Sequence, residues 1–220
     1  MKQIINSQFI SLIGNLLVVI PVCLGIGWVL YYFFDAKLFN EATANAHFMS
    51  NHPFYSLSLI YAIFTGVFLT LAGLVTGYYD NKVVFGEFAE RIRKHPVWMH
   101  KYSSKTLNKA AAFVEKNAGA IIGNLFLGLC LGLAGNLGTF FGLPFDIRHV
   151  TISSGNFSLA LASFYEMPGI FVATVFTGVI LIGILNILSS FLFSFIIACA
   201  SRNLSAKKSM KLLLSVFRRK

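Results

Sequence analysis

Three residues with chemically active side chains lie almost side by side in the second half of the chain: Asp146, Arg148 and His149. A carboxylate and a guanidinium at this spacing can form an ion pair next to the imidazole. A charge-free run, 150–165, follows them and contains several polar residues, among them Ser153, Ser154 and Asn156. This dense polar segment is the best candidate for a functional surface.

No catalytic motif accompanies these residues. The sequence contains no phosphate-binding glycine loop, no Cys-x-x-Cys, no His-Glu-x-x-His and no Gly-x-Ser-x-Gly. Two histidine pairs, His47 with His52 and His95 with His100, are each five residues apart, which is not the i, i+4 spacing of two ligands on one helix face. We therefore predict no catalytic residue, no metal site and no cofactor.

The composition is that of a membrane protein. Of the 220 residues, 56% are hydrophobic and only 12% are charged, and the mean hydropathy is +0.73. A soluble chain of this size would still show charged outer helix faces, and long stretches here show none. The three cysteines lie far apart in apolar runs, which excludes a disulfide scaffold.

Four charge-free stretches are long enough to cross a bilayer, which takes about 20 apolar residues. They are 9–34, 54–79, 118–145 and 167–201. The sequence therefore predicts an all-α polytopic membrane protein. We divide it into a first transmembrane hairpin (1–79), a linker (80–117), a second hairpin (118–201) that includes an outer segment (144–168), and a tail (202–220).

The basic residues predict the orientation. All of the 18 Lys and Arg residues except Lys37 and Arg148 precede the first span, lie in the linker or follow the fourth span. The positive-inside bias then places both termini and the linker in the cytoplasm. The first span is too long for a secretory signal and lacks a cleavage site, so we expect it to be retained.

The outer segment cannot cross the membrane. Its charge-free run, 150–165, is too short and too polar for a span, which predicts a re-entrant or outer-surface element. A re-entrant stretch is tolerated only where protein or water surrounds it. In the alternative interpretation, Asp146 and Arg148 only anchor the segment at the interface and His149 is solvated.

The two hairpins resemble each other in sequence. Three short matches recur about 110 residues apart in the same order, as expected for an internal duplication. They are IGNL at 13–16 and 122–125, FDAK at 34–37 with FDIR at 145–148, and FTGV at 64–67 and 176–179. Both hairpins would have one orientation, related by an axis along the membrane normal. The alternative explanation of these matches is chance similarity between apolar segments.

Small and amide side chains predict how the spans pack. Glycines four residues apart, such as Gly119 with Gly123 and Gly128 with Gly132, let helix backbones approach closely. Amides are costly in hydrocarbon, so Asn15 and Asn124 mark helix faces that point toward protein or water. Asn136 and Asn186 have the same character, and interhelical hydrogen bonds alone would account for all four.

The linker has the pattern of two short amphipathic helices. The first apolar stripe consists of Phe85, Phe88, Ala89 and Ile92, and His95-Pro96 ends that helix. Ser103 or Ser104 can cap the second, whose stripe includes Leu107 and Ala111. We expect the linker to lie on the anionic inner leaflet through its basic residues. The contact residues are Arg91, Arg93, Lys94, Lys101 and Lys105.

Two further interpretations concern the same kind of basic segment. Residues 202–220 alternate apolar and basic side chains, as expected for an interfacial helix. DNA binding by the linker is the sharper alternative to membrane contact. It is disfavoured because the second linker helix offers few base-reading side chains at its start.

At residues 77–84 (GYYDNKVV), 90–96 (ERIRKHP) and 142–156 (GLPFDIRHVTISSGN), the chain resembles the bacterial transmembrane family labelled site-specific recombinase. Members of that family are typically longer, so the resemblance implies their C-terminal membrane part, either as a fragment or as a short member. The label implies DNA strand exchange, which needs a Tyr or Ser nucleophile among several Arg or His groups. Arg148 and His149 are predicted outside, and Tyr102 has only Lys101 and Lys105 nearby.

The sequence thus predicts a non-enzymatic module of the bacterial inner membrane, which acts in transport or envelope assembly through Asp146, Arg148 and His149. The expected partners are the anionic inner leaflet, other membrane or envelope proteins, or further copies of the chain in a homo-oligomer. The alternatives are a membrane-anchored recombination protein, as the family label implies, and a membrane scaffold that only holds partners.

Overall fold

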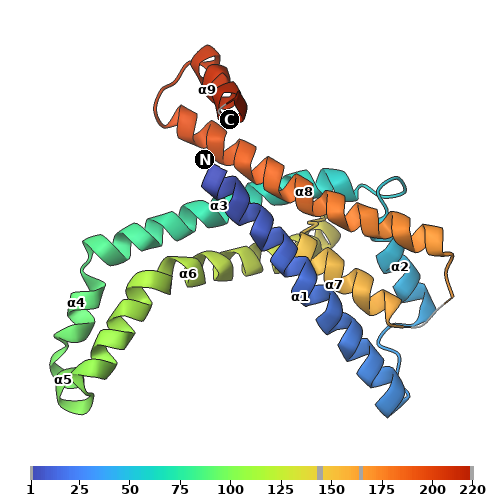
Figure 1. Ribbon diagram of the computed structural model, residues 1–220, viewed down its shortest axis with the longest axis horizontal. Coiled ribbons are helices and arrows are strands. Elements are labelled where there is room, and N and C mark those ends of the chain that lie inside the picture. The colour runs from blue at the N-terminus through green and yellow to red at the C-terminus, as the bar shows by residue number, and fades with distance from the viewer. Residues whose placement is uncertain (1, 143–145, 164–165, 219–220) are drawn as a thin grey trace. The chain divides into compact units, whose positions relative to one another are not determined.

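The computed structural model describes residues 2–142, 146–163 and 166–218, and every regular element among them is a helix (Figure 1). In chain order the helices are α1 (Lys2–Phe34), α2 (Glu41–Asn51), α3 (Ser58–Phe85), α4 (Phe88–Arg93), α5 (Pro96–Lys101), α6 (Ser104–Phe140), α7 (Val150–Leu161), α8 (Gly169–Ala200) and α9 (Ala206–Arg218). Residues 143–145, at the expected end of the third span, and Tyr165 lie outside the described residues.

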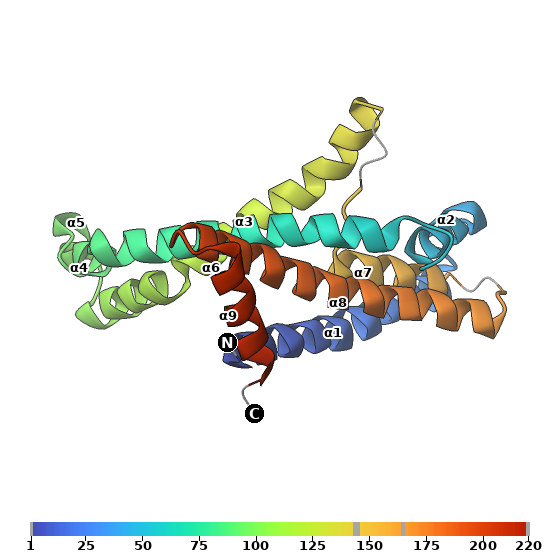
Figure 2. The same ribbon diagram turned by 90° about the horizontal axis from the view of Figure 1, so that it is seen from above.

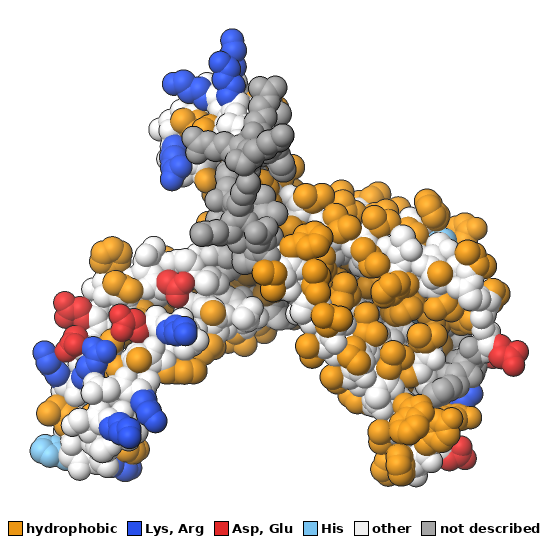
Figure 3. Space-filling view, in the orientation of Figure 1, with side chains coloured by type: hydrophobic (Ala, Val, Ile, Leu, Met, Phe, Trp, Pro, Cys, Tyr) orange, Lys and Arg blue, Asp and Glu red, His pale blue; other side chains and the backbone are white. Residues whose placement is uncertain are grey.

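Four of these helices are long and apolar enough to cross a membrane. They are Leu12–Phe34 within α1, and the whole of α3, α6 and α8. Large apolar side chains on them face outward, as Figure 3 shows over α1 and α8, where a soluble protein would present charges. The prediction of an all-α, multi-pass chain with four spans is confirmed.

The linker differs from its prediction in three respects. Phe85 of the predicted first stripe ends α3, and the following helix, α4, begins at Phe88. The expected cap is present, because the Ser103 hydroxyl accepts a hydrogen bond from the Thr106 N–H at 3.3 Å. The helix that begins there does not stop before the third span but continues into it as the single helix α6. An additional short helix, α5, begins at Pro96, a favourable residue for a first helical turn.

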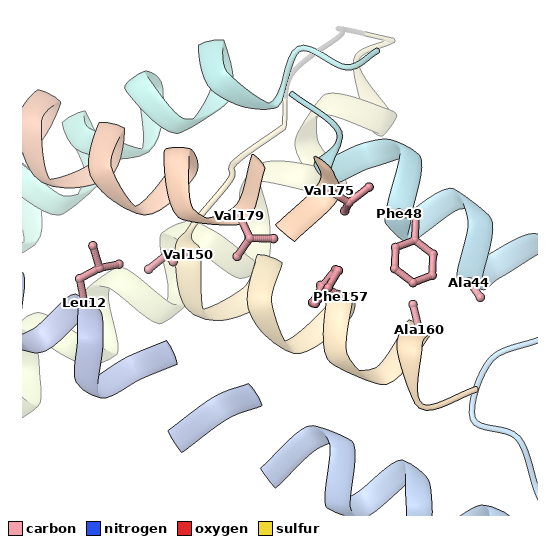
Figure 4. Close-up of a cluster of buried hydrophobic side chains, with 8 residues drawn as sticks. All are labelled: Leu12, Ala44, Phe48, Val150, Phe157, Ala160, Val175 and Val179. Atoms are coloured by element: carbon pink, nitrogen blue, oxygen red, sulfur yellow. The ribbon is translucent and has the colours of Figure 1, made fainter. Parts of the chain in front are cut away.

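The chain forms two compact units, and we describe each by itself. The first contains Met1–Val67 and Pro144–Lys220, and the second contains Phe68–Leu143. The core of the first unit lies where α7 packs against α1, α2 and α8 (Figure 4). Phe48 of α2 and Phe157 of α7 meet there edge to face, with ring centroids 5.7 Å apart.

Small residues allow α7 to lie close to its neighbours. Gly27 of α1 faces Ala162, and Gly183 of α8 faces both Leu12 and Val150 so closely that a Cβ at either glycine would overlap them. Because Val150 is level with Leu12, and Ala162 with Gly27, α7 runs beside α1 within the candidate span. Whether α7 is re-entrant or lies on the outer surface stays a prediction.

In the second unit, two of the predicted glycine contacts are present. Gly119 and Gly123 of α6 lie directly against Asp80 and Thr76 of α3. Gly128 and Gly132 have nothing within 4 Å among the described residues, so that pair packs against no helix here. Within the linker, α4 packs on the first turns of α6, and Leu107 and Ala111 of the predicted stripe are buried.

The element order is compatible with the predicted duplication. A long, a short and a long helix occur in the first half as α1, α2 and α3, and in the second half as α6, α7 and α8. The short helices have similar lengths, 11 and 12 residues. The duplication itself stays a prediction.

Candidate functional site

The ion pair predicted from the sequence is formed. Residues 146–149 are non-helical and lead into α7, and the Arg148 guanidinium contacts the Asp146 carboxylate. The Arg148 side chain is 17% exposed and that of Asp146 is 40% exposed, so the guanidinium lies deeper than its partner. Arg148 also donates from Nη1 to the Ser50 hydroxyl of α2 at 3.2 Å.

One N–H group of the Arg148 guanidinium lacks a hydrogen-bond partner among the described residues. Asp146 Oδ2 contacts Nη2, and Asp146 Oδ1 accepts the Ile147 N–H at 2.7 Å. The neighbouring Nε–H is buried and has no hydrogen-bond partner among the described residues. Nε and Nη2 form the edge of a guanidinium that grips a carboxylate or phosphate with two parallel bonds. Half of that edge is therefore unfilled.

A buried amide from α8 fixes the backbone at the start of α7. Asn186 is almost fully buried, and its Oδ1 accepts the Val150 N–H at 3.0 Å. Its Nδ2 donates to the Arg148 carbonyl at 2.9 Å and to the Ala62 carbonyl of α3 at 3.0 Å. One side chain thus joins α3, α7 and α8.

A second contact from α3 completes the arrangement. The Arg148 N–H donates to the Thr65 hydroxyl at 3.0 Å, and that hydroxyl donates in turn to the Tyr61 carbonyl at 2.9 Å. We refer to Ser50, Thr65, Asp146, Arg148 and Asn186 as the polar centre. Every member comes from the first unit.

The polar centre lies deep along the candidate spans. Asn186 is close to the middle of α8. The 12 residues of α7 span about 18 Å, little more than half of a bilayer core of about 30 Å. The start of α7 lies beside the middle of α8, because Gly183 and Asn186 provide the space and the hydrogen bonds that hold it there. The outer-face position of Asp146, Arg148 and His149 stays a prediction.

Two histidines lie near the ion pair and stay neutral. Burial, and then the positive charge of Arg148, lower the pKa of His47 below its ordinary value. Burial alone lowers the pKa of His149. The His149 Nδ1 accepts the Thr151 N–H at 3.3 Å, so this imidazole caps α7. Neither histidine therefore adds a positive charge to the polar centre at neutral pH.

The serines predicted as part of the segment have another environment. Ser153 and Ser154 are buried within the packing of α7, and Ser154 donates to the Thr151 carbonyl at 3.1 Å. Asn156 is half-buried. The structure thus brings Asp146, Arg148 and His149 together at one end of α7. Ser153, Ser154 and Asn156 lie along the helix itself.

The remaining predicted positions lie elsewhere. Asn15 is half-buried on α1, and Asn124 is exposed on α6. Of the predicted membrane-contact residues, Arg91, Lys94, Lys101 and Lys105 are exposed, while Arg93 is half-buried and donates to Glu90 at 2.8 Å. Their contact with a membrane stays a prediction.

Sequence reasoning missed two members of the polar centre, Ser50 and Thr65. Thr65 belongs to the repeated FTGV motif, which was a signal that this position has a specific environment. Ser50 had no such signal, because it follows an ordinary stretch of α2. Asn186 was recognised as an inward-facing amide, but not as a partner of Arg148.

Comparison with known proteins gives one match. A family model described as site-specific recombinase matches residues 1–220, which include both units and the polar centre. No curated protein and no solved structure matches the chain.

Proposed function

The chain belongs to the site-specific recombinase family, and from this premise and the geometry of the polar centre we propose that it is a non-enzymatic, integral module of the bacterial inner membrane, acting in transport or envelope assembly. The observation that carries the proposal is the largely buried Arg148, paired with Asp146 just before α7. Ionisable groups at membrane depth are costly, and typically belong to a binding site or pathway.

The geometry favours binding of a small anionic group. A carboxylate or phosphate that displaces Asp146 from Arg148 would bond to both Nε and Nη2, where Asp146 reaches only Nη2. Asp146 is the more exposed partner, so it can turn toward water when displaced. When no anion is bound, Asp146 neutralises the charge of the Arg148 guanidinium. We therefore propose that Asp146 is the internal competitor of an anionic ligand.

Anion binding makes a prediction with inorganic phosphate and acetate as probes. Phosphate or acetate, with ionic strength matched by sodium chloride, is expected to raise the Tm of the purified full chain in detergent, because binding to the folded state stabilises it. Asp146→Asn removes the competitor and should lower the apparent Kd about tenfold. Arg148→Met should abolish the response.

Lys37→Met is the matched control, because Lys37 is the first-half counterpart of Arg148 and is exposed. It should respond as the parent does. An equal rise in Tm for the parent and for Arg148→Met would refute binding at Arg148, as would no response to either anion in any of the variants.

We also propose that both termini and the linker are cytoplasmic. The asymmetric distribution of basic residues supports this orientation. With the native cysteines replaced, an impermeant thiol reagent should label Asn45→Cys and Glu166→Cys from outside intact cells and should not label Ser104→Cys. All three positions are exposed, so accessibility of the side chain does not bias the comparison. External labelling of Ser104→Cys would reverse the orientation.

The family description favours a second candidate, a membrane-anchored recombination protein. Tyr102 is exposed next to Lys101, whose Nζ lies 5.7 Å from its ring centroid. Strand exchange also needs Arg or His groups around the nucleophile, and lysine supplies only a point charge. Sequence-selective DNA binding by the full chain in nanodiscs at physiological salt, lost in Tyr102→Phe/Lys101→Gln/Lys105→Gln, would favour this candidate.

A further inference from the structure

We propose that α5, at the tip of the linker, inserts its apolar side chains into the headgroup region of an anionic membrane leaflet. The sequence pointed to the basic residues of the linker as its membrane contact, and it did not predict α5. The proposal adds a specific apolar anchor, Val97-Trp98-Met99, and does not depend on the polar centre.

The apolar surface available for such a contact is on α5. The apolar stripe of α4 and that of the first turns of α6 pack against each other, so Ala89, Leu107 and Ala111 are buried. On α5, by contrast, Val97 is 64%, Trp98 41% and Met99 55% exposed. Exposed apolar residues of this size in a charged linker indicate a contact with another apolar phase or partner.

Charge around α5 selects an anionic partner. Lys94 and Lys101 flank the helix in the sequence, and Lys105 follows in the first turn of α6; all three side chains are exposed. Arg93 is engaged by Glu90 at 2.8 Å, and Lys94 reaches the same carboxylate at 3.3 Å from a largely exposed position. A tryptophan with adjacent lysines is typical of segments at the interface of anionic bilayers.

The linker is also held within reach of the membrane surface. The charge-free stretch of α3 ends at Asp80, and the helix continues only to Phe85, which is about 8 Å of further rise. Beyond it, α4 and α5 turn away from the direction of α3 in Figure 1, and Figure 2 shows both at the end of α3. The start of the linker therefore stays close to the end of the α3 span.

A lipid surface fits these features better than nucleic acid does. DNA contacts of this type rely on basic and amide side chains, and they would leave Val97, Trp98 and Met99 in water. At a lipid interface the same residues leave water while the lysines contact anionic headgroups.

The test uses the full chain in nanodiscs. The sequence has two tryptophans, so Trp28→Phe leaves Trp98 as the single emitter. In nanodiscs with phosphatidylglycerol, Trp98 emission should be blue-shifted, quenched by lipids brominated near the carbonyl end of the acyl chain, and protected from aqueous acrylamide. Replacing Lys94, Lys101 and Lys105 by Gln should lower the lipid quenching about twofold, as should nanodiscs of phosphatidylcholine alone.

Trp98→Phe, which retains Trp28 in α1, is the control, and its quenching by brominated lipids should not depend on lipid charge. Acrylamide quenching of Trp98 without quenching by brominated lipids would overturn the proposal. Protection of Trp98 only after addition of DNA would also overturn it, and would favour a nucleic-acid surface.

Discussion

Replacing Asp146 by alanine is expected to destabilise the full chain by about 3 kcal/mol, because it leaves the buried Arg148 guanidinium without its counter-ion. Arg148→Met should cost less, since Asp146 is the more exposed partner and can be solvated once it is alone. The double variant, Asp146→Ala/Arg148→Met, should be more stable than Asp146→Ala. Unfolding by denaturant in a mild detergent, followed by circular dichroism, measures all three.

The matched control is the first-half pair, Asp35 and Lys37, whose side chains are exposed. Asp35→Asn, which suits the left-handed backbone of Asp35 (φ 48°), and Lys37→Met should each change the unfolding free energy by less than about 0.5 kcal/mol. If Asp146→Ala is no less stable than the parent, or if the double variant is the least stable of the three, the pair is a solvated anchor and not a buried ion pair.

Asn186→Leu should have an effect of similar or larger size, about 3 to 5 kcal/mol, because it leaves the Arg148 carbonyl and the Val150 N–H unpaired in the interior and removes the second hydrogen bond to the Ala62 carbonyl. The Tm in detergent should fall, and hydrogen exchange at the first turn of α7 should accelerate more than exchange in α6. The second readout separates release of α7 from a general loss of stability.

Asn136→Leu is the control for Asn186→Leu. Asn136 is exposed and bonds only to the Gly132 carbonyl of its own helix, at 3.0 Å. This replacement should leave the Tm within about 2 °C of the parent. Equal losses for the two variants would mean that Asn186 is not the residue that joins α3, α7 and α8.

The sequence was sufficient to predict the elements with strong local signals. Four long apolar stretches, the cap at Ser103 and the stop at His95-Pro96 depend on residues close together in the chain, and all three predictions agree with the helices. The Asp146–Arg148 pair was predictable for the same reason, because its partners are two residues apart.

What the sequence could not predict are contacts between distant residues. Nothing local to Arg148 indicates that its N–H meets Thr65, or that its carbonyl meets Asn186. The depth of α7 depends on glycines in α1 and α8 that have no special pattern around them. The sequence alone therefore could not show that the Arg148 backbone is held by α3 and α8.

The dependence of α7 on Asn186 imposes an order on biosynthesis. Asn186 follows Val150 by 36 residues, so the group that pairs with the start of α7 is still inside the ribosome when Val150 leaves it. Until α8 enters the membrane, the Val150 N–H and the Arg148 carbonyl need water in its place. The start of α7 therefore makes its final hydrogen bonds only after Asn186 has left the ribosome, and a nascent chain stopped before Asn186 would lack them.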